Sequence, residues 1–205
     1  MSPQVQRTRA CVLQVARELL LELGPAATTY TAITARSGIT RQTLYRHWPT
    51  RQDLLVDIVH FEPYAAFSTP GEDPEHIVIK FLHSLRARMN DRATGAALMS
   101  LAAQAHRCDA SAAALTAIVV GRRRALNILL ADTGRQVSDQ DFARLCGPVL
   151  YQRFLTQIPV TDSLIKNSVD DWLDGQTICS RLEPPISVKV ESNLEISVAA
   201  ESEEH

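Results

Sequence analysis

The sequence has no long apolar run and no segment of the secretory type. A helix that spans a bilayer needs about 20 consecutive apolar residues, and the apolar runs of this chain are much shorter. Its first residues lack the apolar core and the cleavage site of a signal peptide. We therefore expect a cytoplasmic protein without a membrane segment.

Cysteine and histidine are too scattered to suggest a disulfide framework or a metal site. The four cysteines show no pairing or metal-binding spacing, and the six histidines show no ligand spacing. We expect free thiols and no metal ion. The residues concerned are Cys11, Cys108, Cys146, Cys179, His47, His60, His76, His83, His106 and His205.

The common catalytic motifs are also missing. The chain contains no G-x-S-x-G, no H-E-x-x-H and no glycine-rich phosphate loop. These motifs position a nucleophile, a zinc ion and a nucleotide phosphate respectively. We therefore expect neither an enzyme nor a bound cofactor.

Positive charge, by contrast, is concentrated at one end of the chain. Residues 1–52 hold seven arginines against two glutamates, whereas the whole chain has a formal charge of −2, so the remainder carries −7. A positive field confined to the N-terminal quarter suits a protein that meets nucleic acid there.

This N-terminal part contains two short helices joined by a tight turn. Thr29 is placed to cap the first helix, which we expect to end near Ser37, and Gly38 supplies the turn. Thr40 is placed to cap the second helix, which Pro49 ends. Two such helices alone are commonly a core hairpin, so the function depends on what the second helix exposes.

The second helix has an apolar side and a polar side. At 100° per residue, Leu44, His47 and Trp48 gather on one side, and Gln42 and Arg46 point away from it. Arginine pairs with guanine, glutamine pairs with adenine, and threonine methyl groups contact thymine. The polar side therefore predicts a recognition helix for the major groove. Its flanks carry Arg41, Thr43 and Tyr45.

A further helix begins directly after Pro49. Thr50 and Asp53 have the spacing of a capping box, and Arg51 stands in the first turn, where an exposed cation can hold a phosphate. His47 has two interpretations: it packs against the core, or it contacts a phosphate.

The segment resembles the N-terminal domain of the TetR (tetracycline-repressor-like) family of bacterial transcriptional regulators. Two positions differ from the family pattern: Thr34 replaces a buried alanine, so its hydroxyl needs a carbonyl one turn back, and Trp48 replaces phenylalanine. The positions that fill the pattern in register are Thr29, Ile33, Ser37, Gly38, Ile39, Thr40, Thr43, Leu44, Tyr45, His47, Arg51 and Leu54.

The resemblance implies roles for these residues. It assigns Arg41, Gln42 and Thr43 to base edges, and Tyr45, His47 and Arg51 to the DNA backbone. The candidate DNA-binding residues are Thr29, Thr31, Thr40, Arg41, Gln42, Thr43, Tyr45, Arg46, His47 and Arg51.

The periodicity of apolar residues predicts an all-α protein. We expect a three-helix, homeodomain-like head at 1–50, with the helix-turn-helix at about 29–48, and a C-terminal helical ligand-binding and dimerisation domain at 51–182. An acidic tail at 183–205 carries a net charge of −5, and we expect it to be mobile. The expected helices are 7–23, 51–61, 74–90, 93–106, 110–131, 139–157 and 162–179.

The last two helices carry wide apolar stripes. One interpretation is a hairpin buried in the monomer, and the other is a hairpin that pairs with its twin in a homodimer. The resemblance favours the second, because TetR-like regulators dimerise through their final helices. The candidate interface residues are Phe142, Val149, Leu150, Phe154, Leu164, Val169 and Trp172.

An effector site is the least determined feature. The resemblance implies a regulator, most often a repressor, that binds a near-palindromic operator as a dimer and responds to an unknown small molecule. The alternative is a dimeric DNA-binding protein that senses no ligand. We interpret most of the run Arg122–Arg124 as a solvated face, because its members point in three directions. The candidate pocket residues are Phe81, Leu85, Met89, Leu98 and Met99.

Overall fold

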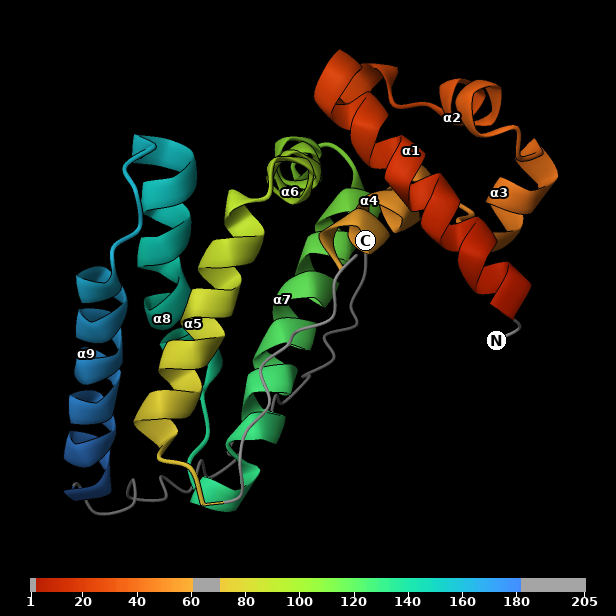
Figure 1. Ribbon diagram of the computed structural model, residues 1–205. Coiled ribbons are helices and arrows are strands. Elements are labelled where there is room, and N and C mark those ends of the chain that lie inside the picture. Colours follow the sequence, from red (N-terminus) through yellow and green to blue (C-terminus); the bar gives the residue numbers. More distant parts are fainter. Residues whose placement is uncertain (1–2, 61–70, 182–205) are drawn as a thin grey trace, which may run out of the picture.

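The computed structural model describes residues 3–60 and 71–181, and it describes side chains for 4–60 and 71–175. Every regular element in these ranges is helical, which confirms the all-α class (Figure 1). The acidic segment 183–205 lies outside the described residues. The α-helices are α1 (Pro3–Ala27), α2 (Tyr30–Ser37), α3 (Arg41–His47), α4 (Arg51–Val59), α5 (Pro74–Asn90), α6 (Arg92–Ala105), α7 (Asp109–Leu129), α8 (Asp139–Tyr151) and α9 (Asp162–Arg181).

The predicted caps of the head all form. Thr29 accepts from the Ala32 amide, and Thr50 and Asp53 make the reciprocal capping box at the start of α4. The Thr34 hydroxyl donates to the Thr31 carbonyl at 2.9 Å. It thereby finds the acceptor that a threonine needs where the family pattern has a buried alanine. Gly38 ends α2 with a φ of +71°, a left-handed conformation that favours glycine.

A first core joins the head to the upper body. Helices α1 to α4 bury apolar residues against each other and against α6 and α7, so α4 packs against the body as well as against the head. Its buried members are Val12, Leu13, Ala16, Leu19, Leu20, Ile33, Leu44, Trp48, Leu54, Leu55, Ile58, Val59, Ala93, Ala97, Leu101 and Ile118.

A second core fills the body between α5, α7, α8 and α9. In Figure 1, α8 and α9 lie at the end of the body farthest from α2 and α3. The buried members are Ile77, Val78, Phe81, Leu82, Leu85, Met89, Leu126, Leu130, Val137, Phe142, Leu145, Cys146, Val149, Ile165, Val169 and Trp172.

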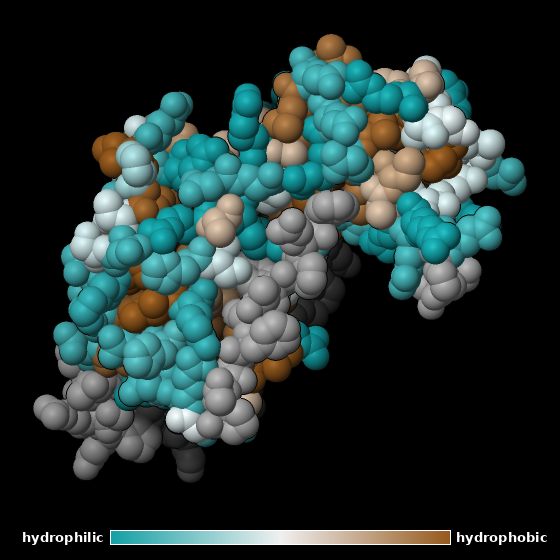
Figure 2. All heavy atoms as spheres, viewed as in Figure 1, coloured by the Kyte–Doolittle hydropathy of each residue, from teal (hydrophilic) through white to brown (hydrophobic). Residues whose placement is uncertain are grey.

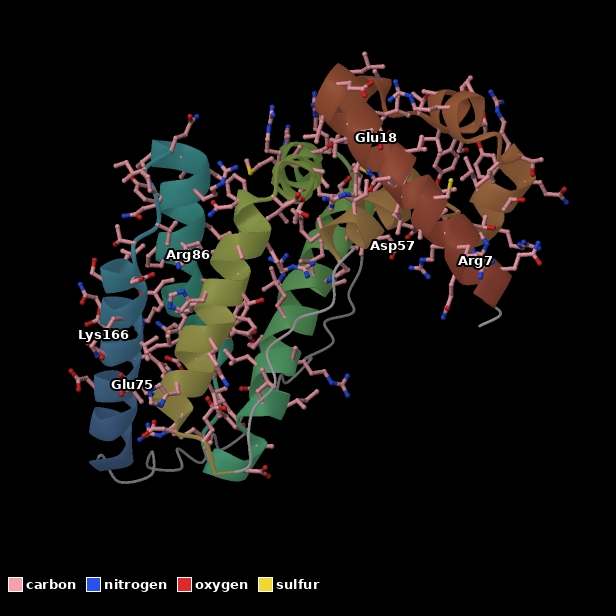
Figure 3. The ribbon with its side chains drawn as sticks, viewed as in Figure 1. Arg7, Glu18, Asp57, Glu75, Arg86 and Lys166 are labelled. Atoms are coloured by element: carbon pink, nitrogen blue, oxygen red, sulfur yellow. The ribbon has the colours of Figure 1, made fainter. Side chains whose placement is uncertain are left out.

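Two ion pairs link α9 to α5. Arg86 bonds Asp162 at 2.6 Å, and Lys166 lies 3.4 Å from Glu75, so both ends of α5 are tied to α9 (Figure 3). The exposure of both pairs limits each to at most about 1 kcal/mol of stability. The packing of the second core, and not the ion pairs, holds α9 in place.

The eighth helix ends earlier than the sequence predicted. Regular α-helix stops at Tyr151, and a π-helical turn, η2 (Gln152–Thr156), replaces the expected continuation to residue 157. Within this turn the Arg153 Nε donates to the Met89 carbonyl at 2.9 Å, and the Phe154 ring lies against Gly95. Contacts with α5 and α6 therefore accompany the change in helix type, and the local sequence pattern does not encode them.

No helix within the described ranges is long and apolar enough to cross a membrane. The side chains of Cys11, Cys108 and Cys146 are free thiols, and the side chain of Cys179 lies outside the described residues.

Asp57 connects three helices of the head. Its carboxylate, 20% exposed, accepts from Arg9 of α1 and, at 2.5 Å, from the indole Nε1 of Trp48 at the end of α3. The Arg9 guanidinium also lies 5.9 Å from the centre of the Trp48 ring. Asp57 itself belongs to α4, so one side chain sets the mutual positions of α1, α3 and α4 (Figure 3).

Replacing Asp57 with alanine should lower the free energy of unfolding by about 2–3 kcal/mol, because it leaves a half-buried guanidinium and a buried indole N–H without their acceptor. Urea denaturation measures the change. Asp139→Ala is the matched control: it removes an 80% exposed carboxylate that pairs with Arg123 and should cost no more than about 1 kcal/mol. Equal losses in the two variants would contradict the role of Asp57.

Candidate nucleic-acid interface

Burial of the apolar side of α3 orients its polar side outward. Leu44 is fully buried and Trp48 almost so, whereas Arg41, Gln42, Tyr45 and Arg46 are exposed. This is the orientation that the helical periodicity predicted. The Thr40 hydroxyl accepts from the Thr43 amide at 3.3 Å and caps the helix. In the first turn of α3, the backbone capped by Thr40 therefore lies next to the exposed polar side chains.

Thr31 and Arg41 connect the two helices of the motif. The Arg41 guanidinium donates to the Thr31 hydroxyl at 2.7 Å, and both side chains are exposed. This contact uses one of the five guanidinium N–H groups and leaves the others for an acceptor. Thr31 on α2 therefore holds Arg41 extended from the outer side of α3. Thr29 lies at the start of α2 as its cap, and it is exposed.

Tyr30 positions the turn that follows the recognition helix, a role that the sequence analysis missed. Its hydroxyl lies 2.6 Å from the Trp48 carbonyl and 2.7 Å from the Thr50 carbonyl. Burial and, to a smaller extent, the nearby Asp53 carboxylate raise the pKa of the Tyr30 hydroxyl to about 12. The hydroxyl therefore stays protonated and can donate hydrogen bonds. The Tyr30 ring meets that of Tyr45 edge to face at 5.0 Å. The Tyr45 hydroxyl is thus presented at the surface from a supported ring.

His47 lies at the edge of a hollow between α1 and α3. The ring is half buried against Trp48, with 5.6 Å between ring centres, and its Nε2 has no hydrogen-bond partner among the described residues. The ring therefore packs, as one interpretation of His47 expects, and this Nε2 is buried. The hollow measures about 460 Å³ and is lined by Gln4, Val5, Thr8, Gly38, Ile39, Thr40, Thr43, Arg46 and His47.

This hollow adds the N-terminal end of α1 to the candidate interface. Gln4, Thr8 and the exposed Arg7 stand at that end, which Figure 3 marks at Arg7. These residues were not among the predicted DNA-binding residues, because the spacing of apolar residues in α1 identifies only the buried side of the helix. The concentration of arginine in residues 1–52 was the available signal.

Arg51 differs from its expected state. The sequence predicted an exposed cation, but the side chain is half buried and donates to the Pro25 carbonyl near the C-terminal end of α1. Burial lowers its pKa from the usual value. Arg51 therefore fixes the start of α4 against the C-terminal end of α1, and only part of its guanidinium group faces solvent.

The candidate pocket residues divide into two groups. Phe81, Leu85 and Met89 are fully buried in the second core, and Leu98 is half buried, but Met99 is 40% exposed. Helix α6 packs through Ala93, Ala97 and Leu101, so Met99 lies on its outer side and does not line an interior pocket. Two surface hollows of the body, of about 260 and 510 Å³, are lined by other residues.

The candidate dimer residues also divide. Phe142, Val149, Val169 and Trp172 are core residues of the protomer, so they support α8 and α9 from within and do not offer side chains to a second copy. This corrects their expected role. Leu150, Phe154 and Leu164 are half buried. Figure 2 shows apolar atoms at the outer end of α8 and η2, where Tyr151, Leu155 and Ile158 are exposed.

The helices of the head match a known family of DNA-binding proteins. Residues 12–58 match the family described as bacterial regulatory proteins, tetR family. The crystal structure of the TetR family transcription regulator SCO0332 is 28% identical, with a TM-score of 0.62, and the match covers 82% of this chain and 97% of that one. This chain belongs to the TetR family. It is a DNA-binding transcription regulator.

Other solved structures share the TetR fold at lower identity. A TetR transcriptional regulator from Agrobacterium tumefaciens is 18% identical, with a TM-score of 0.60, over 89% of this chain and 100% of that one. The multidrug binding protein EbrR, complexed with imidazole, is 16% identical, with a TM-score of 0.56, over 80% of this chain and 93% of that one. No curated protein sequence matches this chain.

Among the described residues of this TetR family regulator, no three histidine, cysteine or acidic side chains are grouped so as to hold a metal ion.

Replacing Gln42 with alanine should weaken binding to the cognate operator by about 1–3 kcal/mol and relax the preference at one or two base pairs, because a base-edge contact is lost. Fluorescence anisotropy on the operator and its single-base variants measures both effects. Gln140→Ala, at an exposed position of α8, is the matched control. If the Gln42 variant lost affinity equally for all sequences, its role in base reading would be wrong.

Proposed function

We propose that this TetR family protein is a ligand-responsive repressor that binds a near-palindromic operator as a homodimer. The observation that carries the proposal is the outward side of α3, where Arg41, Gln42 and Arg46 stand exposed while Leu44 and Trp48 anchor the helix. The exposed Tyr45 supplies a hydroxyl group for the DNA backbone.

The proposed response to a small molecule rests on a structural relative and on the apolar core of the body. EbrR, which has the same fold, is described as a multidrug binding protein and was crystallised with imidazole. In this chain the body holds Phe81, Leu85 and Met89 in one core with α8 and α9, next to the core that includes α4. The alternative function is a dimeric DNA-binding protein whose body senses no ligand.

Selection of bound sequences from a random DNA pool, followed by footprinting, tests the DNA-binding part. We expect two symmetric half-sites whose centres lie about 34–36 Å, or a multiple of this, apart on one DNA face. A reporter gene with this operator inside its promoter should be silenced by the protein. A single asymmetric site would contradict the dimer, and activation of the reporter would contradict repression.

The dimer is expected to form at the outer end of α8. Leu155 is 70% and Ile158 is 55% exposed there, and Tyr151 is exposed beside them. Ala143 and Gly147 stand one turn apart on the same helix, and a Cβ on Gly147 would meet no atom within 4 Å. Small residues next to exposed apolar ones allow a second helix to approach closely, which is the packing that a helical dimer needs.

Replacing Leu155 and Ile158 together with glutamate should convert the dimer to a monomer that binds the operator weakly, because like charges would face each other across the two-fold axis. Light scattering at micromolar concentration measures the mass. Ile128→Glu, at an exposed apolar position of α7, is the control and should leave the dimer intact. A double variant that remains dimeric would place the interface elsewhere.

A further inference from the structure

Helix α7 carries an arginine in the middle of its buried side. Ile118, Arg122 and Leu126 follow one another at intervals of four residues, and all three are buried. Ile118 belongs to the core shared with the head and Leu126 to the core of the body, so Arg122 lies at the junction of the two. Figure 1 shows α7 extending from the head along the body.

The run Arg122–Arg124 is not the mostly solvated face that the sequence predicted, because Arg122 is buried. Arg124 is exposed, and Arg123 is half buried and bonds Asp139 at 2.7 Å. Arg122, however, is 6% exposed. Adjacent arginines thus have three environments, and only one is enclosed.

The enclosed guanidinium has no counter-ion among the described residues. Its Nε and Nη2 are buried without a hydrogen-bond partner. A guanidinium does not deprotonate in a protein, so it cannot escape burial by losing its charge. An unpaired buried charge is among the most costly arrangements in a fold, and nearly all buried polar groups of native proteins are paired. An anion that entered the junction would remove this cost.

The electrostatics of the junction also favour an anion. Burial, followed by Arg122 and Arg88, lowers the pKa of His60 at the end of α4, while Asp57 acts in the opposite direction. The Asp57 carboxylate is already bonded to Arg9 and Trp48. Burial raises the pKa of the Cys146 thiol to about 12, so Cys146 stays neutral despite the opposing effect of Arg122. Among the described residues, the groups near Arg122 thus leave its positive charge uncompensated.

We propose that Arg122 binds the carboxylate of a small, largely apolar organic anion, and that this anion is the effector. The inference rests on the proposed ligand response and names its chemical class. A planar guanidinium fork matches a carboxylate with two parallel hydrogen bonds. A monoanion matches a single unpaired cation without burying further charge, and the cores on both sides of Arg122 suit an apolar remainder.

Melting temperatures test the site with matched probe pairs: sodium benzoate against benzamide, and sodium octanoate against octanamide, at constant ionic strength. The carboxylates should raise the melting temperature of the wild-type protein by about 5–10 °C at about 100 times their Kd, and the amides should not. If no carboxylate stabilised the wild type more than its amide, the proposal would be overturned.

Two variants, each of which removes one arginine charge, distinguish the proposed site from the protein surface. Arg122→Met should reduce carboxylate affinity about 10- to 100-fold, because a charged hydrogen-bonded pair is lost, whereas Arg124→Met should leave it unchanged. Without a carboxylate, Arg122→Met should be at least as stable as the wild type, because it removes an unpaired buried charge. A destabilised or unfolded Arg122→Met protein would show that Arg122 is already satisfied and would overturn the proposal.

Arg122→Lys keeps the charge but not the fork, so it should fold and bind carboxylates more weakly than the wild type. Full carboxylate affinity in this variant would also count against the proposal. Operator affinity, measured with and without benzoate or octanoate, separates this inference from the proposed function. Operator binding without any carboxylate effect would overturn only the effector class. Carboxylate binding through Arg122 that leaves operator affinity unchanged would overturn the ligand response, and with it the effector role of the anion.

Discussion

The head depends on one carboxylate that three helices share. Asp57 of α4 accepts from Arg9 of α1 and from the Trp48 indole at the end of α3. Trp48 is also buried in the core, so the position of α3 is set both by packing and by a directed hydrogen bond. A recognition helix only seven residues long has little stability of its own. Its ability to meet DNA in a fixed orientation therefore comes from α1 and α4.

The local features of the head could be read from the sequence because each depends on neighbours in the chain. The caps at Thr40 and Thr50 and the left-handed Gly38 follow from residue type at a fixed offset. The outward direction of Gln42 and Arg46 follows from the helical period once Leu44 and Trp48 are buried. The same reasoning placed the start of α5 at Pro74 and that of α9 at Asp162.

Features that depend on packing between distant segments could not be read in this way. The environment of Arg51 is set by the Pro25 carbonyl, which lies 26 residues away in the chain. Met99 and the apolar stripes of α8 and α9, which include Phe142 and Trp172, show the same limit, because an apolar residue on a helix does not reveal which neighbour covers it. Arg122 is a different case: its spacing of four residues from Ile118 and Leu126 places it on the buried side of α7, but arginine is seldom a buried residue type.

The shared first core has a consequence for regulation. Because α4 buries Leu54, Leu55, Ile58 and Val59 against residues of the head and of α6 and α7, the head cannot turn on the body without disturbing that core. Close-packed interiors move between discrete arrangements and do not deform continuously. In a dimer, the separation of the two recognition helices would therefore be set by the packing of α4 on α6 and α7. Any molecule that changes this packing at the junction must alter operator affinity, and by linkage the operator must alter the affinity for that molecule by the same factor.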